Sequence, residues 1–194
     1  MTDEYERSAE FVDVLLAPHR AGLGPPLSAA LRGTTGPIVD VGAGGGQGTR
    51  VIANSVAEAE IVAVEPSMTS RTTLPARVSE NAELRDRVTV LPEHLLEAAL
   101  PHRLGALVAM NVIGHFDAAG RQAIWTMLAD RLAPGGRAVL NLEPPGAPVT
   151  VPESRFADVR IGPRRYEGRD RAEPVPSPIG PVEPGMHVIN GGDA

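Results

Sequence analysis

Short apolar runs alternate with longer amphipathic stretches along the first three quarters of the chain. The apolar runs are rich in branched side chains and end at glycine, proline or a polar residue, which is typical of buried strands. They predict strands at residues 37–42, 60–66, 87–91, 104–112 and 137–143. The amphipathic stretches predict helices at residues 49–59, 68–84 (interrupted at Pro75), 93–100 and 118–132.

The strand–helix alternation predicts how these elements are arranged. Parallel neighbours need crossover connections, and helices in the crossovers cover both faces of the sheet. We therefore expect an α/β fold, a three-layer sandwich with a mostly parallel, doubly wound sheet. Ligands of such sheets bind beyond the carboxyl ends of the strands, so the residues that follow each strand are the candidates for a site.

The pattern changes after residue 143, where proline and glycine become frequent. Within residues 153–168, Ala157, Val159 and Ile161 alternate with polar residues, and Gly162 with the following proline is a turn signal. This stretch predicts a hairpin. The proline-rich sequence beyond it has too few core-forming residues to fold by itself, so we expect a tail.

Composition excludes several classes of site and partner. The net charge is −6 and the sequence shows no basic face, so we expect no nucleic-acid partner. The chain has no cysteine, which excludes disulfides, thiolate metal sites and a cysteine nucleophile. Residues 1–11 lack the apolar core of a signal peptide, and no apolar run approaches the ~20 residues that span a membrane. The expected location is cytoplasmic, without membrane contact.

The glycine-rich stretch VDVGAGGGQGT, at residues 39–49, joins the first predicted strand to the first predicted helix. A P-loop is rejected because the chain has no lysine to hold the terminal phosphates. A dinucleotide fingerprint fails in every register, because its third glycine would be Gln47, Thr49 or Val51. A nicotinamide-dependent oxidoreductase therefore stays only as the weakest alternative.

The spacing that does fit is Asp40-x-Gly42-x-Gly44-x-Gly46. It resembles the first motif of class I, Rossmann-like methyltransferases that use S-adenosyl-L-methionine. In these proteins the glycines let the backbone, with Ala43 between them, approach the methionyl part and ribose of the cofactor. An acid at position 40 suits a ligand that carries an ammonium and a sulfonium.

Further residues match this family's next motifs in order. Glu65 ends the second predicted strand, where the family has an acid that accepts both ribose hydroxyls. Pro66 follows it, and Met68 stands where an apolar residue packs on adenine. After the third strand, either Glu93 or His94 takes the position that holds the adenine amino group.

The end of the fourth predicted strand, VAMNVIGHF, resembles the family's fourth motif. There the backbone carbonyl of Asn111 or Val112 is implied to receive the methionyl ammonium. His115 lies beside the implied acceptor site and is our candidate general base. The alternative is that His115 caps or packs against the next helix, and His19 is a weaker candidate.

Upstream, residues 4–16 resemble the N-terminal helix of small-molecule members, with matches at Tyr5, Ala9 and Asp13. In such enzymes this helix covers the cofactor and lines the acceptor pocket. The resemblance makes Tyr5 a candidate substrate gate, unless it is an ordinary packed or surface tyrosine.

The resemblance implies S-adenosyl-L-methionine as cofactor and methyl transfer to an oxygen or nitrogen of a small-molecule acceptor, with no metal. An alternative is a methyltransferase-like protein that binds the cofactor without turnover. The family's sheet has seven strands and this chain supplies five, so the C-terminal part is shortened or atypical, and a homodimer would cover the exposed edge. The expected organisation is lid helices at 1–33, a cofactor-binding α/β core at 34–145, an edge hairpin at 146–171 and a Pro/Gly-rich tail at 172–194.

Overall fold

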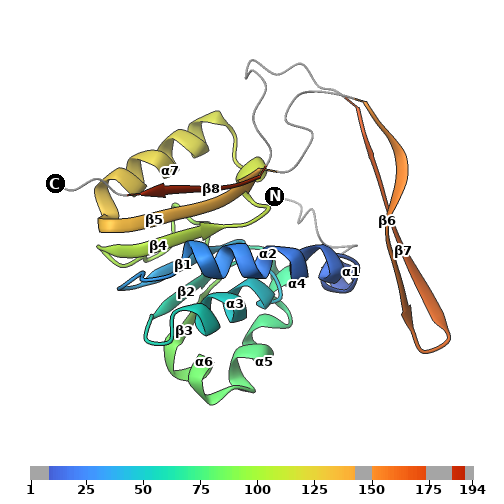
Figure 1. Ribbon diagram of the computed structural model, residues 1–194, viewed down its shortest axis with the longest axis horizontal. Coiled ribbons are helices and arrows are strands. Elements are labelled where there is room, and N and C mark those ends of the chain that lie inside the picture. The colour runs from blue at the N-terminus through green and yellow to red at the C-terminus, as the bar shows by residue number, and fades with distance from the viewer. Residues whose placement is uncertain (1–8, 143–149, 174–184, 191–194) are drawn as a thin grey trace.

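A computed structural model describes residues 9–142, 150–173 and 185–190 of the chain. In these residues one sheet has the strand order β3-β2-β1-β4-β5-β8 (Figure 1). Strands β1 to β5 are parallel to their neighbours, and β8 runs antiparallel to β5. The bounds are β1 (Ile38–Val41), β2 (Ile61–Val64), β3 (Val88–Leu91), β4 (Leu104–Ala109), β5 (Leu132–Leu142) and β8 (Gly185–Asn190).

Helices cover both faces of this sheet (Figure 1). One apolar cluster joins α2, α3, α5 and α6 to one face, and a second cluster joins α7 to the other. This arrangement confirms the predicted three-layer fold. The bounds are α1 (Ala9–Leu15), α2 (Ala17–Ala30), α3 (Gln47–Ser55), α4 (Met68–Arg71), α5 (Leu74–Ser79), α6 (Ala82–Arg87), the 3₁₀ helix η1 (Ile113–His115) and α7 (Ala118–Arg131).

Strand β1 shows why the sequence folds into layers. Ile38 packs in the first cluster and Val39 in the second, and both are fully buried. A parallel strand covered on both faces needs apolar side chains at consecutive positions, which is the composition of β2 and, apart from Asp40, of β1. Each such side chain stabilises the fold by about 1.5–3 kcal/mol.

The helix predicted at residues 93–100 is wrong. The structure has a single turn there, in which the N–H groups of Glu97 and Ala98 donate to the His94 carbonyl at 2.9 and 3.0 Å. Leu95 is buried and anchors the segment, and Pro101 directly follows residue 100, where the predicted helix would have ended. One anchored turn is enough to connect β3 to β4, so no regular helix forms.

The helix predicted at residues 68–84 is divided into α4, α5 and α6. Pro75 lies in the first turn of α5, where its missing N–H has no helical partner to lose. The proline therefore marks the start of a new helix.

The C-terminal part differs from the expected edge hairpin. Strands β6 (Val151–Ile161) and β7 (Arg164–Ala172) form the predicted hairpin, but as a separate two-stranded sheet that stands apart from the main one (Figure 1). Its Tyr166 packs on Phe11 of α1, with ring centroids 5.7 Å apart. The strand that covers β5 is β8, which the sequence placed in the tail.

Candidate functional site

The carboxyl ends of β1, β2 and β4 lie side by side, because these strands are parallel neighbours in the sheet. Val41 is in register with Val64, and the N–H of the next residue, Gly42, donates to the Val64 carbonyl at 2.9 Å. The topology thus places the glycine loop (residues 42–46) next to Glu65, as the sequence predicts for neighbouring strand ends.

The three glycines of the motif have different structural reasons. All three have positive φ, 65° at Gly42, 54° at Gly44 and 88° at Gly46. A β-carbon at Gly42 would lie 2.7 Å from Cγ2 of Val112, and one at Gly46 would lie 2.5 Å from Cδ1 of Leu74. At Gly44 a β-carbon would meet no atom of the described residues closer than 4.0 Å. Packing inside the protein therefore explains two glycines, whereas Gly44 presents bare backbone to open space.

The Glu65 carboxylate is held beside this bare backbone. It is buried at 7% exposure, and one of its oxygens, Oε2, accepts the Gly44 N–H at 2.8 Å. Its other oxygen, Oε1, accepts the Ser67 N–H at 2.9 Å. Each of the two carboxylate oxygens is thus held by a backbone amide. The side chain is oriented by the backbone before any ligand arrives.

Asp40 is turned into the protein, beneath the start of α3. It is 4% exposed, and its Oδ2 accepts the Thr49 hydroxyl at 2.6 Å. The pKa of Asp40 is raised to about 6, chiefly by burial; the Thr49 hydrogen bond lowers this pKa in part, and the negative charge of Glu65 contributes to raising it. Asp40 therefore fixes the first turn of α3 to β1, and its direct contact with a cationic ligand stays a prediction.

Beyond β4, Asn111 has φ 57°, the only positive φ of a non-glycine residue in the described part of the chain. Its N–H donates to Oδ1 of Asn141, and Nδ2 of Asn141 donates to Oδ1 of Asn111. Asn141 lies in β5 and is 7% exposed. The sequence analysis did not identify Asn141, although a lone amide inside the apolar run of a predicted strand was a usable signal.

Helix α1 is fixed to the glycine loop through Asp13. Its carboxylate accepts hydrogen bonds from Arg20 at 2.7 Å and from Arg77 at 3.4 Å. Arg77 also donates to the carbonyl of Gly45 in the loop. The predicted lid helix thus lies against the site, whereas Tyr5, the predicted gate, is outside the described residues.

The residues predicted near adenine border the same strand ends. Pro66 and Met68 follow β2, and Met68 begins α4 with 74% of its surface exposed. Glu93 and His94 are exposed in the turn that follows β3. The N–H of Glu65 donates to the carbonyl of Leu91 at 3.0 Å, so the ends of β2 and β3 are adjacent. These residues thus follow two adjacent strand ends, and their contacts with adenine stay predictions.

His115 is exposed at the end of η1, and its backbone N–H donates to the carbonyl of Val112 at 3.0 Å. This places it three residues from a side chain that contacts Gly42 of the loop. His19 is exposed on α2. In the part of the chain that the structure describes, no group of three or more histidines and acids could hold a metal ion, and no helix is long and apolar enough to cross a membrane.

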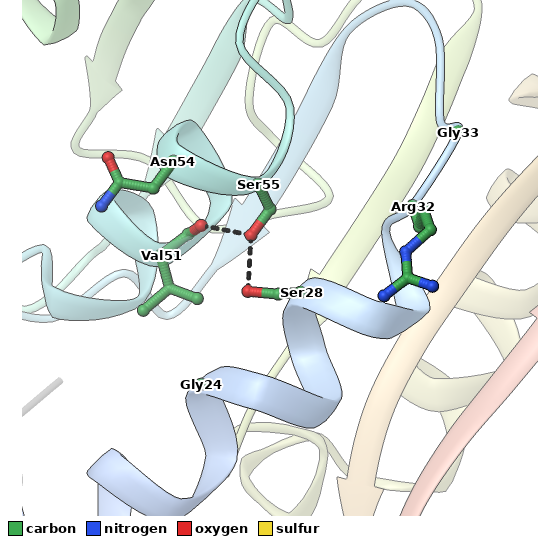
Figure 2. A pocket seen from close by; sticks show the side chains of 7 residues that line it. All are labelled: Gly24, Ser28, Arg32, Gly33, Val51, Asn54 and Ser55. Atoms are coloured by element: carbon green, nitrogen blue, oxygen red, sulfur yellow. Dashed lines mark hydrogen bonds between the residues drawn. The ribbon is translucent and has the colours of Figure 1, made fainter.

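A shallow hollow of about 460 Å³ lies between α2 and α3, at the C-terminal end of α3. Figure 2 shows Ser28 and Ser55 facing each other there, joined by a hydrogen bond of 2.7 Å. The glycine loop adjoins the opposite, N-terminal end of α3. The hollow is therefore not part of the candidate site.

Comparison with protein families finds a match to the model of a methyltransferase domain over residues 38–136. This match contains the glycine loop, Glu65 and Asn111. No curated protein sequence matches the chain.

Among solved structures, the glycopeptide N-methyltransferase MtfA is similar, with 26% identity over 81% of this chain and 74% of that chain, at a TM-score of 0.54. Its complex with S-adenosyl-L-methionine matches at 23% identity over 87% and 75% of the two chains, with a TM-score of 0.56. A candidate O-methyltransferase from Nostoc punctiforme PCC 73102 matches at 16% identity over 69% and 40%, with a TM-score of 0.58. The last two likenesses show a shared fold.

Proposed function

Because this chain belongs to the methyltransferase domain family, we propose that it transfers a methyl group from S-adenosyl-L-methionine to a nitrogen or oxygen of a small molecule. MtfA, which is similar over most of its length, was crystallised with S-adenosyl-L-methionine, sinefungin and S-adenosyl-L-homocysteine. The family match also removes support from the nicotinamide-dependent alternative.

One observation carries the proposal: the buried Glu65 carboxylate is held next to the bare backbone of Gly44. A vicinal diol needs two acceptor oxygens at a fixed orientation, and Glu65 offers them. The ribose of the cofactor would lie over Gly44, where a β-carbon has open space and a side chain would compete with the ligand. The two acceptor oxygens and the open space both fit an adenosyl ligand.

Other residues then have assigned tasks. Met68 would pack on adenine, with Pro66 shaping the turn, and Glu93 or His94 would accept a hydrogen bond from the adenine amino group. These side chains are exposed at the strand ends, so each can contact the ligand without a rearrangement of the core. The backbone carbonyl of Asn111 would receive the methionyl ammonium.

S-adenosyl-L-methionine supplies an electrophilic methyl group on a sulfonium. The chain's own residues would orient the two reactants and exclude water. Orientation of this kind lowers the activation barrier of a displacement by a large amount. His115, which is exposed and whose backbone N–H donates to the carbonyl of Val112, would accept the proton from an acceptor hydroxyl. An amine acceptor that binds in its neutral form leaves His115 no such task.

Thermal unfolding in the presence of S-adenosyl-L-methionine, S-adenosyl-L-homocysteine or NAD tests the proposal. A ligand at ~100 times its dissociation constant adds ~2.7 kcal/mol of stability, a shift of several degrees. We expect both adenosyl compounds to raise the melting temperature and NAD to leave it unchanged. A shift with NAD alone, or with none of the three, would overturn the proposal. Binding without methyl transfer to any amine or phenol screened would favour the alternative of a binding protein.

A further inference from the structure

The amide pair Asn111–Asn141 joins the ends of β4 and β5 beside the glycine loop. We propose that Asn141 is a positioning residue: it holds Asn111 in its left-handed backbone conformation, and so aims the backbone after β4 at the aminocarboxyl end of the cofactor. This inference rests on the proposed function and extends it to a residue with no place in the sequence motifs.

The first step is the conformation of Asn111. The left-handed conformation at φ 57° is strained for any residue that has a β-carbon, and asparagine tolerates it better than most residues. The strain is stored where β4 ends, and such strain persists only when neighbouring groups compensate for it. Asn141 is the neighbour whose hydrogen bonds provide this compensation.

The second step is the direction of the two hydrogen bonds. A backbone N–H can only donate, so the Asn141 atom facing it must be the carbonyl oxygen Oδ1. The Asn141 amide nitrogen is then fixed toward Oδ1 of Asn111. One side chain therefore holds both the main chain and the side chain of Asn111, which fixes the peptide plane and the rotamer together.

The third step is burial. Asn141 is 7% exposed and follows Leu140, which is in the core. A buried amide costs free energy unless it is hydrogen-bonded, so an apolar residue would be the simpler choice for a strand of this core. An amide at this position is explained if it serves the neighbouring strand end.

The fourth step links the pair to the ligand. Val112, the residue after Asn111, contacts Gly42, where a β-carbon would lie 2.7 Å from Cγ2 of Val112. A change in the backbone at Asn111 would therefore move Val112 against the loop that binds the cofactor. Glu65, which is proposed to bind the ribose, follows β2 and lies on the other side of β1 from β4. The adenosine half of the ligand should therefore depend on Asn141 much less than the aminocarboxyl end does.

The test compares two ligands that differ in the aminocarboxyl end, S-adenosyl-L-homocysteine and adenosine, by isothermal titration calorimetry. Asn141→Ala should weaken S-adenosyl-L-homocysteine about tenfold, because Asn111 loses both partners. Binding of adenosine should change less than twofold. Asn54→Ala, an exposed asparagine on α3, is the matched control and should change neither.

Rescue distinguishes positioning from a general loss of stability. Glycine adopts positive φ at little cost, so Asn111→Gly in the Asn141→Ala background should restore most of the lost affinity. Asn111→Ala alone should reproduce the selective loss, and it serves if Asn141→Ala fails to fold. Equal losses for both ligands, or no rescue by glycine, would overturn the inference. A wild-type protein that binds no S-adenosyl-L-homocysteine would overturn the proposed function itself.

Discussion

The carboxylate of Glu65 accepts the backbone N–H of Gly44 at 2.8 Å, which connects the end of β2 to the glycine loop after β1. Two motifs that are 21 residues apart in the chain thereby form one site. The acid is buried and oriented by amides, while the loop backbone beside it is open. This pair gives the first prediction.

Replacing Glu65 by alanine should weaken binding of S-adenosyl-L-homocysteine about ten- to a hundredfold. The loss corresponds to ~1.5–3 kcal/mol, the range for hydrogen bonds to a charged group. Calorimetric titration measures it directly. Glu60→Ala is the matched control, because Glu60 is an exposed acid just before β2. Equal affinities of the Glu65 variant and the wild type would remove this acid from the site.

Asp40→Asn should change how stability depends on pH. Burial raises the pKa of Asp40 from 3.8 to about 6, so between these values the folded protein binds more protons than the unfolded chain. The wild type should therefore lose stability as the pH rises from about 4 to about 7. The effect is up to about 3 kcal/mol at 1.36 kcal/mol per pKa unit.

The Asp40→Asn protein keeps an acceptor for the Thr49 hydroxyl and lacks the titration. Its free energy of unfolding, relative to wild type, should rise by this amount across the same pH interval. Urea denaturation at pH 4.5, 6 and 7.5 measures the difference. A constant difference at all three values would mean that the pKa of Asp40 is close to that of the unfolded chain.

Asp13→Asn should loosen α1 from the glycine loop. The variant loses the charge that faces Arg20 and Arg77, and partly exposed ion pairs of this kind contribute about 0.5–1 kcal/mol. Hydrogen exchange of residues 9–15 should become two- to fivefold faster. Asp130→Asn, on the exposed side of α7, should leave that exchange unchanged. Unaltered exchange in both variants would show that other contacts hold α1.

His115→Ala should slow methylation of a hydroxyl acceptor by about 10²–10⁴, the usual contribution of a general base. Affinity for S-adenosyl-L-homocysteine should stay within twofold. The measurement is the rate of S-adenosyl-L-homocysteine formation with a phenol found by screening. His102→Ala, at an exposed histidine in the loop before β4, is the control. Unchanged turnover in the His115 variant would leave the histidine a structural role at the end of η1.

The sequence alone predicted most of the fold and which strand ends form the candidate site. Branched apolar runs ending at Gly42 and Glu65 identify strands that must be buried on both faces, and this local property does not depend on distant contacts. Parallel neighbours then bring their carboxyl ends together, so the glycine loop and the acid were expected to meet. In the structure the Gly44 backbone nitrogen lies 2.8 Å from Oε2 of Glu65.

Other features depended on contacts that no local pattern contains. The helix expected around Leu95 is a single turn. Burial of Leu95 holds this turn in place, and the short connection between β3 and β4 needs no regular helix. The sequence predicts a tail around Met186, yet this segment pairs with β5 as strand β8. An open sheet edge can form hydrogen bonds with a strand from any part of the chain.

The sequence by itself determined the layered fold, the family resemblance and the strand ends that form the candidate site. Hydrophobic periodicity and glycine spacing are local properties, so they can be recognised without knowledge of distant contacts. Only the tertiary structure decided the directions of side chains at that site. It turned Asp40 inward to Thr49, and it paired Asn141 with Asn111, 30 residues away. A buried polar group costs free energy unless it is hydrogen-bonded, and which groups are close enough to bond depends on the folded sheet.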